Sequence, residues 1–382
     1  MMQKADFPFF EKNPNLLYLD SAATSLKPQV MIDAVQQYYT AQSVSVHRGL
    51  YPLAKKVTDE FEMARSIIAQ AINARPEQIV FVPSVTYALT MLANNLACGK
   101  RVLLTDLEHH ANLVCWLEQK KKGAHIDFLS LTQTFDVEYD VNKIKNASII
   151  STTHVSNVTG TVVDVKRLRQ FSPNATIIVD GAQAFGHMPV DVQELDCDFY
   201  VFSAHKSLGP TGLGMLYVKD PEALNPFVFG GNMVEQVTQK GATFVKAPHV
   251  FEAGTPAIAQ VLGFAKSVAY LQEHSIERIH SYICGLTNFA KEQLSQIQGC
   301  TLYVHEQSPG ILSFSVSGKH AQDIVTFLGE RGVCVRSGHH CAMPLIEKIC
   351  KEGTVRVSLH AYNTKEDIQL FCKYLQEVLQ VI

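Results

Sequence analysis

Short, nearly continuous apolar runs recur between residues 78 and 218, and small or polar residues follow most of them. Such runs predict strands that are buried on both faces of a parallel sheet. Helical periodicity fills several of the gaps, so we expect an α/β fold with one mostly parallel seven-stranded sheet. The predicted strands lie near residues 78–82, 101–105, 125–131, 148–153, 176–179, 198–203 and 214–218.

Helical patterns flank this sheet, and a smaller α+β pattern begins at residue 311. A short strand precedes the first helices near residues 16–20. We predict an N-terminal arm (1–28) that packs on a small C-terminal domain (261–382), and a large domain between them (29–260). Predicted helices are 29–43, 53–74, 258–274, 276–297, 321–330 and one from Thr364 onward; the remaining strands are 311–316, 333–337 and 354–359.

Composition favours a well-buried globular protein, because 47% of the 382 residues are hydrophobic and 18% are charged. The net charge of −3 and the lack of a basic cluster longer than Lys120–Lys122 argue against nucleic-acid binding. No apolar stretch approaches the ~20 residues of a membrane span. The N-terminus lacks the apolar region of a signal peptide, so we expect a cytoplasmic protein that does not contact membranes.

The chain has nine cysteines, an odd count, and no Cys-x-x-Cys pair. This pattern argues against a disulfide framework and against a structural zinc site, so no metal is expected.

Two of the predicted strands end on charged residues that are suited to one site. Asp180 closes the strand near 176–179, and Lys206 follows the strand near 198–203. Open α/β sheets bind ligands beyond the carboxyl ends of their strands. Pyridoxal 5'-phosphate requires such a pair, because its aldehyde forms a Schiff base with a lysine and its ring nitrogen needs a carboxylate. A solvated lysine and a helix-capping aspartate are the alternatives, and spacing alone does not decide between them.

Other side chains with suitable chemistry also follow strands. Thr86 opens a helix after the strand near 78–82, where backbone N–H groups suit a phosphate, and Ser203 and His205 offer further donors. His109 follows the next strand and is placed to stack on a ring and to move protons. An ordinary helix cap and a surface histidine are the alternatives. Asn157 follows a further strand and offers an amide.

Near the C-terminus, Cys341 lies in a loop between Arg336 and two histidines. Positive neighbours favour the nucleophilic thiolate form of a cysteine. A metal ligand and an inert thiol are the alternatives, and tandem His-His-Cys is poorly spaced for one metal ion. Arg356 lies in an otherwise apolar strand, where an arginine normally pairs with a carboxylate of the protein or of a substrate.

Taken together, these residues resemble those of the fold-type I, class V aminotransferase-like enzymes, and most closely the group II cysteine desulfurases of the SufS and CsdA type. The similar segments occur in family order over nearly the whole chain. They are Tyr18-Leu-Asp-Ser-Ala-Ala-Thr24, Val46-His-Arg-Gly49, Glu108-His-His-Ala-Asn112, Val155-Ser-Asn-Val-Thr-Gly160, Val179-Asp-Gly-Ala-Gln183, Ser203-Ala-His-Lys206, Phe251-Glu-Ala-Gly-Thr-Pro256, Arg336-Ser-Gly-His-His-Cys341 and Arg356 with Tyr362-Asn-Thr364.

The resemblance implies that L-cysteine is converted to L-alanine, with a persulfide left on Cys341, to supply sulfur for Fe–S cluster assembly or related sulfur transfer. It implies a homodimer, a small sulfur-acceptor protein and bound pyridoxal 5'-phosphate. The implied catalytic residues are Lys206, Cys341 and His109. The implied cofactor contacts add Asp180, Gln183, Asn157, Thr86, Ser203, His205 and, from the partner subunit, Thr255. The implied substrate contacts are Arg356, Asn157, Arg336, Ala22 and His47.

The chain departs from the family at Pro83-Ser-Val-Thr-Tyr87, where the family usually has Arg-Gly-Thr-Thr-Glu. Pro83 contributes no backbone N–H, and Val85 replaces a hydroxyl on the side expected to hold the phosphate. Two alternative functions remain open, and the altered loop favours only the second. One is a selenocysteine lyase, acting on L-selenocysteine, or another lyase of carbon–sulfur bonds that releases sulfide directly. The other is a non-catalytic scaffold that binds a sulfur-acceptor protein.

Overall fold

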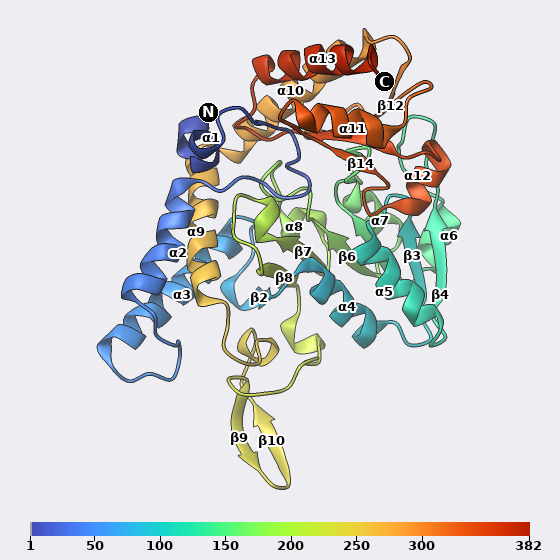
Figure 1. The fold of residues 1–382 in the computed structure, drawn as a ribbon. Coiled ribbons are helices and arrows are strands. Elements are labelled where there is room, and N and C mark those ends of the chain that lie inside the picture. The colour runs from blue at the N-terminus through green and yellow to red at the C-terminus, as the bar shows by residue number, and fades with distance from the viewer. Residues whose placement is uncertain (1) are drawn as a thin grey trace.

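A seven-stranded sheet between two layers of helices forms the larger part of the protein (Figure 1), seen in a computed structural model that describes residues 2–382. The strand order is β2-β8-β7-β6-β5-β3-β4, and β8 is antiparallel to both of its neighbours while the other pairs are parallel. The predicted fold class is confirmed. The strands are β2 (Ile79–Val82), β3 (Arg101–Thr105), β4 (His125–Leu129), β5 (Ile149–Thr153), β6 (Thr176–Asp180), β7 (Phe199–Ser203) and β8 (Gly214–Val218).

Both faces of this sheet are buried, which explains the continuous apolar runs of its strands. In β6, Ile177 and Val179 pack in one apolar cluster and Ile178 packs in the other, on the opposite face. The first face is covered by α3 (Pro52–Gln70), α6 (Val141–Asn146), α7 (Val165–Phe171), α8 (Val192–Leu195) and α9 (Ile258–Glu273). The second face is covered by α4 (Val85–Leu96) and α5 (His110–Lys120).

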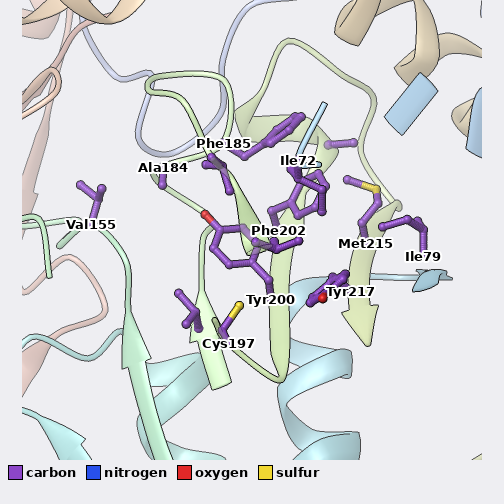
Figure 2. Packing of buried hydrophobic residues seen from close by; sticks show 14 of the residues in the cluster. Ile72, Ile79, Val155, Ala184, Phe185, Cys197, Tyr200, Phe202, Met215 and Tyr217 are labelled. Atoms are coloured by element: carbon purple, nitrogen blue, oxygen red, sulfur yellow. The ribbon is translucent and has the colours of Figure 1, made fainter. Parts of the chain in front are cut away.

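Aromatic side chains pack directly beneath the turn that follows β6. Phe202 stacks on Phe185 with ring centroids 4.2 Å apart, and Tyr200 lies beside them (Figure 2). A Cβ atom added at Gly181 would lie 2.1 Å from Cζ of Tyr200, so only glycine permits this close approach. The turn is thereby held against the core, and this fixes the carboxyl end of β6.

The C-terminal part is a smaller antiparallel sheet of order β11-β12-β15-β14, with helices on one face. The last helix begins at a capping box, since Thr364 accepts from the backbone of Asp367 and the Asp367 side chain accepts in return. The strands are β11 (Cys300–Tyr303), β12 (Ile311–Val316), β14 (Arg336–Gly338) and β15 (Thr354–Ser358). The helices are α10 (Ile276–Ser295), α11 (Ala321–Glu330), α12 (Met343–Ile349) and α13 (Lys365–Leu379).

The N-terminal segment joins this smaller unit. After α1 (Pro8–Lys12), β1 (Leu17–Tyr18) pairs in parallel with β13 (Val333–Cys334), and Leu17 and Leu19 are buried in the core of the small sheet. α2 (Gln29–Ala41) then packs against α9. The predicted boundary at residue 260 falls inside α9, whose side chains pack with the large sheet.

One predicted strand is divided, and some elements were not predicted. The strand predicted at 333–337 is divided at Val335, because its first half pairs with β1 and its second half with β15. The hairpin β9 (Val234–Thr238) and β10 (Gly241–Phe244), which projects from the body in Figure 1, was not predicted, because its residues are mostly exposed and carry no apolar alternation. β11 was also not predicted. Within residues 2–382, no helix is long and apolar enough to cross a membrane.

Candidate active site

A cavity of about 330 Å³ opens at the carboxyl ends of the parallel strands, beneath the small sheet. All of the predicted site residues line it except Thr255 and His47. The lining comprises Ala22, Ala23, Ser84, Val85, Thr86, His109, Ala111, Thr153, Val155, Asn157, Asp180, Ala182, Gln183, Ser203, His205, Lys206, Arg336, His340, Cys341 and Arg356.

Asp180 and Lys206 meet in this cavity, as their positions after neighbouring strands predict. Asp180 is 4% exposed, and its Oδ1 accepts from the backbone N–H of Ala182 at 3.0 Å. Its Oδ2 has no hydrogen-bond partner within the described part of the chain. Burial raises the pKa of Asp180. Burial also lowers the pKa of Lys206 to about 8, although the Asp180 carboxylate opposes this shift. An appreciable fraction of Lys206 is therefore neutral near physiological pH.

His109 caps α5 with its own side chain. Nδ1 accepts from the backbone N–H of Ala111 at 3.0 Å, so the proton of the neutral ring is on Nε2. Burial, together with the positive charge of Lys206, lowers the pKa of His109 to about 3. The ring is thus uncharged at neutral pH.

Two amide side chains are held by backbone carbonyls at the same edge. Nε2 of Gln183 donates to the carbonyl of Ala22 at 2.9 Å, and Nδ2 of Asn157 donates to that of His340 at 2.6 Å. Each amide nitrogen has two hydrogens, so one N–H of each remains free for a ligand.

Hydroxyl and backbone donors gather at the end of the cavity formed by α4. Ser84 caps this helix and accepts from the backbone N–H of Tyr87 at 3.2 Å. The hydroxyls of Thr86 and Ser203 line the cavity without a hydrogen-bond partner in residues 2–382. Burial and the nearby Lys206 lower the pKa of His205 to about 4, so this ring is neutral. A helix N-terminus with free donors suits an anion such as a phosphate.

Arg356 is paired with a carboxylate of the protein itself. Its Nη2 lies 3.3 Å from Oδ1 of Asp20, and its Nη1 donates to the carbonyl of Asn157 at 3.0 Å. The more exposed Arg336 also binds Asp20, at 3.0 Å. Arg356 Nε is buried and unpaired among the described atoms. Two guanidinium groups on one carboxylate leave net positive charge in the cavity, which suits an anionic substrate group.

Cys341 lies at the mouth of the cavity and is exposed. Cys115, Cys197 and Cys372 are buried, and burial raises the pKa of each to about 12. Their thiols are therefore protonated and shielded, whereas Cys341 is the cysteine that combines exposure with a place at the cavity.

The two predicted residues that do not line the cavity lie elsewhere. His47 is beside Glu62 and His249, with its Nε2 3.8 Å from Oε1 of Glu62. Thr255 lies in the segment before α9. The expected partner-subunit role of Thr255 and the expected substrate contact of His47 stay predictions.

Asp20 was not recognised from the sequence, although it lies inside the motif that runs from Tyr18 to Thr24. One signal could have indicated it. Asp20 is a carboxylate in a loop of small residues, and both Arg336 and Arg356 need a carboxylate to pair with. His340 was also not singled out, although it lines the cavity beside Cys341.

Comparison with known proteins agrees with this geometry. The model of the family "Aminotransferase class-V" matches residues 17–371. A probable cysteine desulfurase of Synechocystis sp. is 38% identical, over 99% of this chain and 95% of the relative. The apo structure of a cysteine desulfurase from Thermococcus onnurineus is 32% identical with a TM-score of 0.94, over 99% of this chain and 98% of that one. The cysteine desulfurase CsdA of Escherichia coli is 36% identical with a TM-score of 0.91, with the same coverage.

Proposed function

This chain belongs to the aminotransferase class-V family, among its cysteine desulfurases, and from that premise we propose that it transfers the sulfur of L-cysteine to Cys341 and releases L-alanine. One observation carries this proposal. A single cavity combines the Lys206–Asp180 pair, a buried arginine and an exposed cysteine.

The residues of the cavity fit pyridoxal 5'-phosphate. Lys206 Nζ would hold the cofactor covalently, the free Oδ2 of Asp180 would face its ring nitrogen, and His109 would lie against the ring. When bound, the cofactor withdraws electrons from the substrate's Cα and so promotes loss of its proton and of the sulfur on Cβ. The free N–H groups of Gln183 and Asn157 suit its ring hydroxyl; Thr86, Ser203 and His205, with Thr255 of the partner subunit, suit its phosphate.

Side chains of this protein transfer the protons and accept the sulfur. Neutral Lys206 Nζ takes a proton from Cα, because burial lowers the pKa of this amine to about 8. His109 carries its ring proton on Nε2 and is placed to donate it. The Cβ–S bond of cysteine breaks and an S–S bond forms to the sulfur of Cys341. The carbon is reduced by two electrons and both sulfurs are oxidised to the persulfide level, so cysteine and thiol give alanine and persulfide in balance.

Arg356 and Arg336 are placed to receive the substrate carboxylate. Arg356 is 3% exposed, and its Nε is unpaired among residues 2–382, so a bound carboxylate would satisfy a buried donor. Asp20 holds both arginines in position and keeps the pair from repelling each other. Ala22 lines the same part of the cavity, close to Gln183.

We further propose that the protein works as a homodimer and passes its persulfide sulfur to a small acceptor protein, which supplies Fe–S cluster assembly or related sulfur transfer in the cytoplasm. The exposure of Cys341 supports the transfer step, because a partner must reach that sulfur atom. The position of Thr255 outside this chain's own cavity supports a contribution across a dimer.

The proposal is tested by locating the sulfur after one turnover. The holoenzyme, incubated with L-cysteine and without reductant, should release alanine and carry one extra sulfur atom on the peptide that contains Cys341, as measured by mass spectrometry. Release of sulfide together with pyruvate and ammonia in place of alanine, with no extra mass on that peptide, would favour the lyase instead.

A further inference from the structure

The loop that carries Cys341, residues 338–342, has an unfavourable backbone conformation. His340 and Cys341 are consecutive residues with φ of 50° and 56°, in the left-handed region that side chains other than glycine rarely adopt. Such residues persist only where surrounding contacts hold them. The position of the Cys341 sulfur therefore depends on whatever fixes this loop.

Three groups outside the loop bind its backbone or its buried histidine. Nδ2 of Asn157 donates to the carbonyl of His340 at 2.6 Å, and Nε2 of His340 lies 3.1 Å from the carbonyl of Thr354. The third group is His110, the first residue of α5.

His110 makes two contacts, one to the cysteine itself and one to the backbone two residues beyond it. Its backbone N–H donates to the carbonyl of Cys341 at 2.6 Å. Its Nε2 accepts from the backbone N–H of Met343 at 3.1 Å. His110 does not belong to the cavity lining, whereas its neighbours His109 and Ala111 do. Its side chain therefore acts on the loop and not on a bound ligand.

We propose that His110 is a positioning residue that holds the Cys341 loop in place for sulfur transfer. The inference rests on the proposed function, because Cys341 must receive sulfur for its position to matter. The side chain of His110 binds the start of α12 and its backbone binds the carbonyl of Cys341, so one residue fixes the chain at the cysteine and just beyond it.

The chemistry of this contact makes it sensitive to protonation. Met343 N–H is a donor, so Nε2 must accept, and the proton of the neutral ring is on Nδ1. An imidazolium has no acceptor, so protonation of His110 breaks the contact. Burial, and then the neighbouring His339, lower the pKa of His110. The groups that face it are His109 on its own element, and His339 and Cys341 on the loop.

One ion pair joins the same two elements and remains after protonation. Lys348 of α12 binds Asp106, in the turn after β3, at 2.6 Å. Protonation of His110 is therefore expected to loosen the loop without detaching α12. The contact is formed at neutral pH and is lost in acid, below the lowered pKa of His110.

Hydrogen–deuterium exchange tests the contact without using catalysis. In the holoenzyme at neutral pH, the amide of Met343 should exchange about five-fold faster in His110→Ala, the effect of losing one hydrogen bond. His110→Gln places a carbonyl oxygen near the position of Nε2 and should restore slow exchange. His339→Ala is the matched control, since it removes a loop imidazole whose side chain makes no hydrogen bond among the described residues, and it should leave this exchange unchanged.

Kinetics then tests the function of the contact. We expect persulfide formation on Cys341 to slow about five-fold in His110→Ala, with the cofactor absorbance retained. His110→Gln should keep the wild-type rate at neutral pH and decline less in acid than the wild type, because its amide does not titrate while Lys206 still does. Three results would overturn the proposal. They are unchanged exchange of the Met343 amide in His110→Ala, faster exchange or slower persulfide formation in His110→Gln than in the wild type, and an equal effect on both in His339→Ala. Wild-type enzyme that puts no sulfur on Cys341 would instead refute the proposed function, and the exchange result would still decide the contact.

Discussion

Replacing Lys206 by alanine should abolish alanine formation from L-cysteine and remove the absorbance of covalently attached cofactor. We expect the rate to fall by about 10⁴-fold or more, because one amine provides both the covalent attachment and the proton acceptor. Its lowered pKa of about 8 suits the second task at neutral pH. The measurement is single-turnover alanine production, with the absorbance spectrum recorded on the same sample.

Lys206→Arg is the matched control for this prediction. Arginine keeps the positive charge beside Asp180 but is not a nucleophilic amine, so this variant should be as inactive as the alanine variant. Wild-type alanine production by Lys206→Ala would show that another group carries the chemistry.

Replacing Glu252 by alanine should lower the free energy of unfolding by about 3–5 kcal/mol, the usual cost of removing one partner of a buried ion pair. Glu252 binds Arg65 through both oxygens, at 2.6 and 2.9 Å, and the two side chains are 4% and 1% exposed. Glu252 also accepts from the backbone N–H of Phe81 at 2.7 Å. The substitution would leave the buried guanidinium of Arg65 without the carboxylate that neutralises most of its charge. Denaturant unfolding at one fixed protein concentration measures the effect.

Glu62→Gln provides the comparison on the same arginine. Glu62 binds Arg65 at 2.8 Å but is 35% exposed, so its removal should cost only about 1 kcal/mol or less. If both variants lowered the free energy of unfolding by the same amount, Glu252 would not be the main stabilising partner of Arg65.

The strands of the large sheet could be predicted because burial on both faces makes each of them a continuous apolar run. β3 and β8 have the predicted bounds, and the others differ by at most two residues at an end. The β9–β10 hairpin could not be predicted, since exposed residues carry no such pattern. The division of the strand predicted at 333–337 depends on two different partners, which the local sequence does not specify.

The site residues could also be predicted only where the local sequence carries the signal. Asp180 and Lys206 could be located because polar residues after buried strands must meet at one edge of the sheet. The pairing of Asp20 with Arg356 could not, because it joins residues 336 positions apart through the packing of the N-terminal segment on the small sheet. The contacts of His110 depend equally on how the Cys341 loop folds back on α5.

The most direct test of the central claim compares alanine formation from L-cysteine by the wild-type protein and by Cys341→Ala, both loaded with pyridoxal 5'-phosphate. If Cys341 accepts the sulfur, the wild type forms alanine and persulfide, and the variant loses both while it retains the cofactor absorbance. A variant that keeps the wild-type rate of alanine formation would show that the sulfur does not pass to Cys341 and would contradict this account, whereas pyruvate and sulfide in place of alanine would identify a carbon–sulfur lyase.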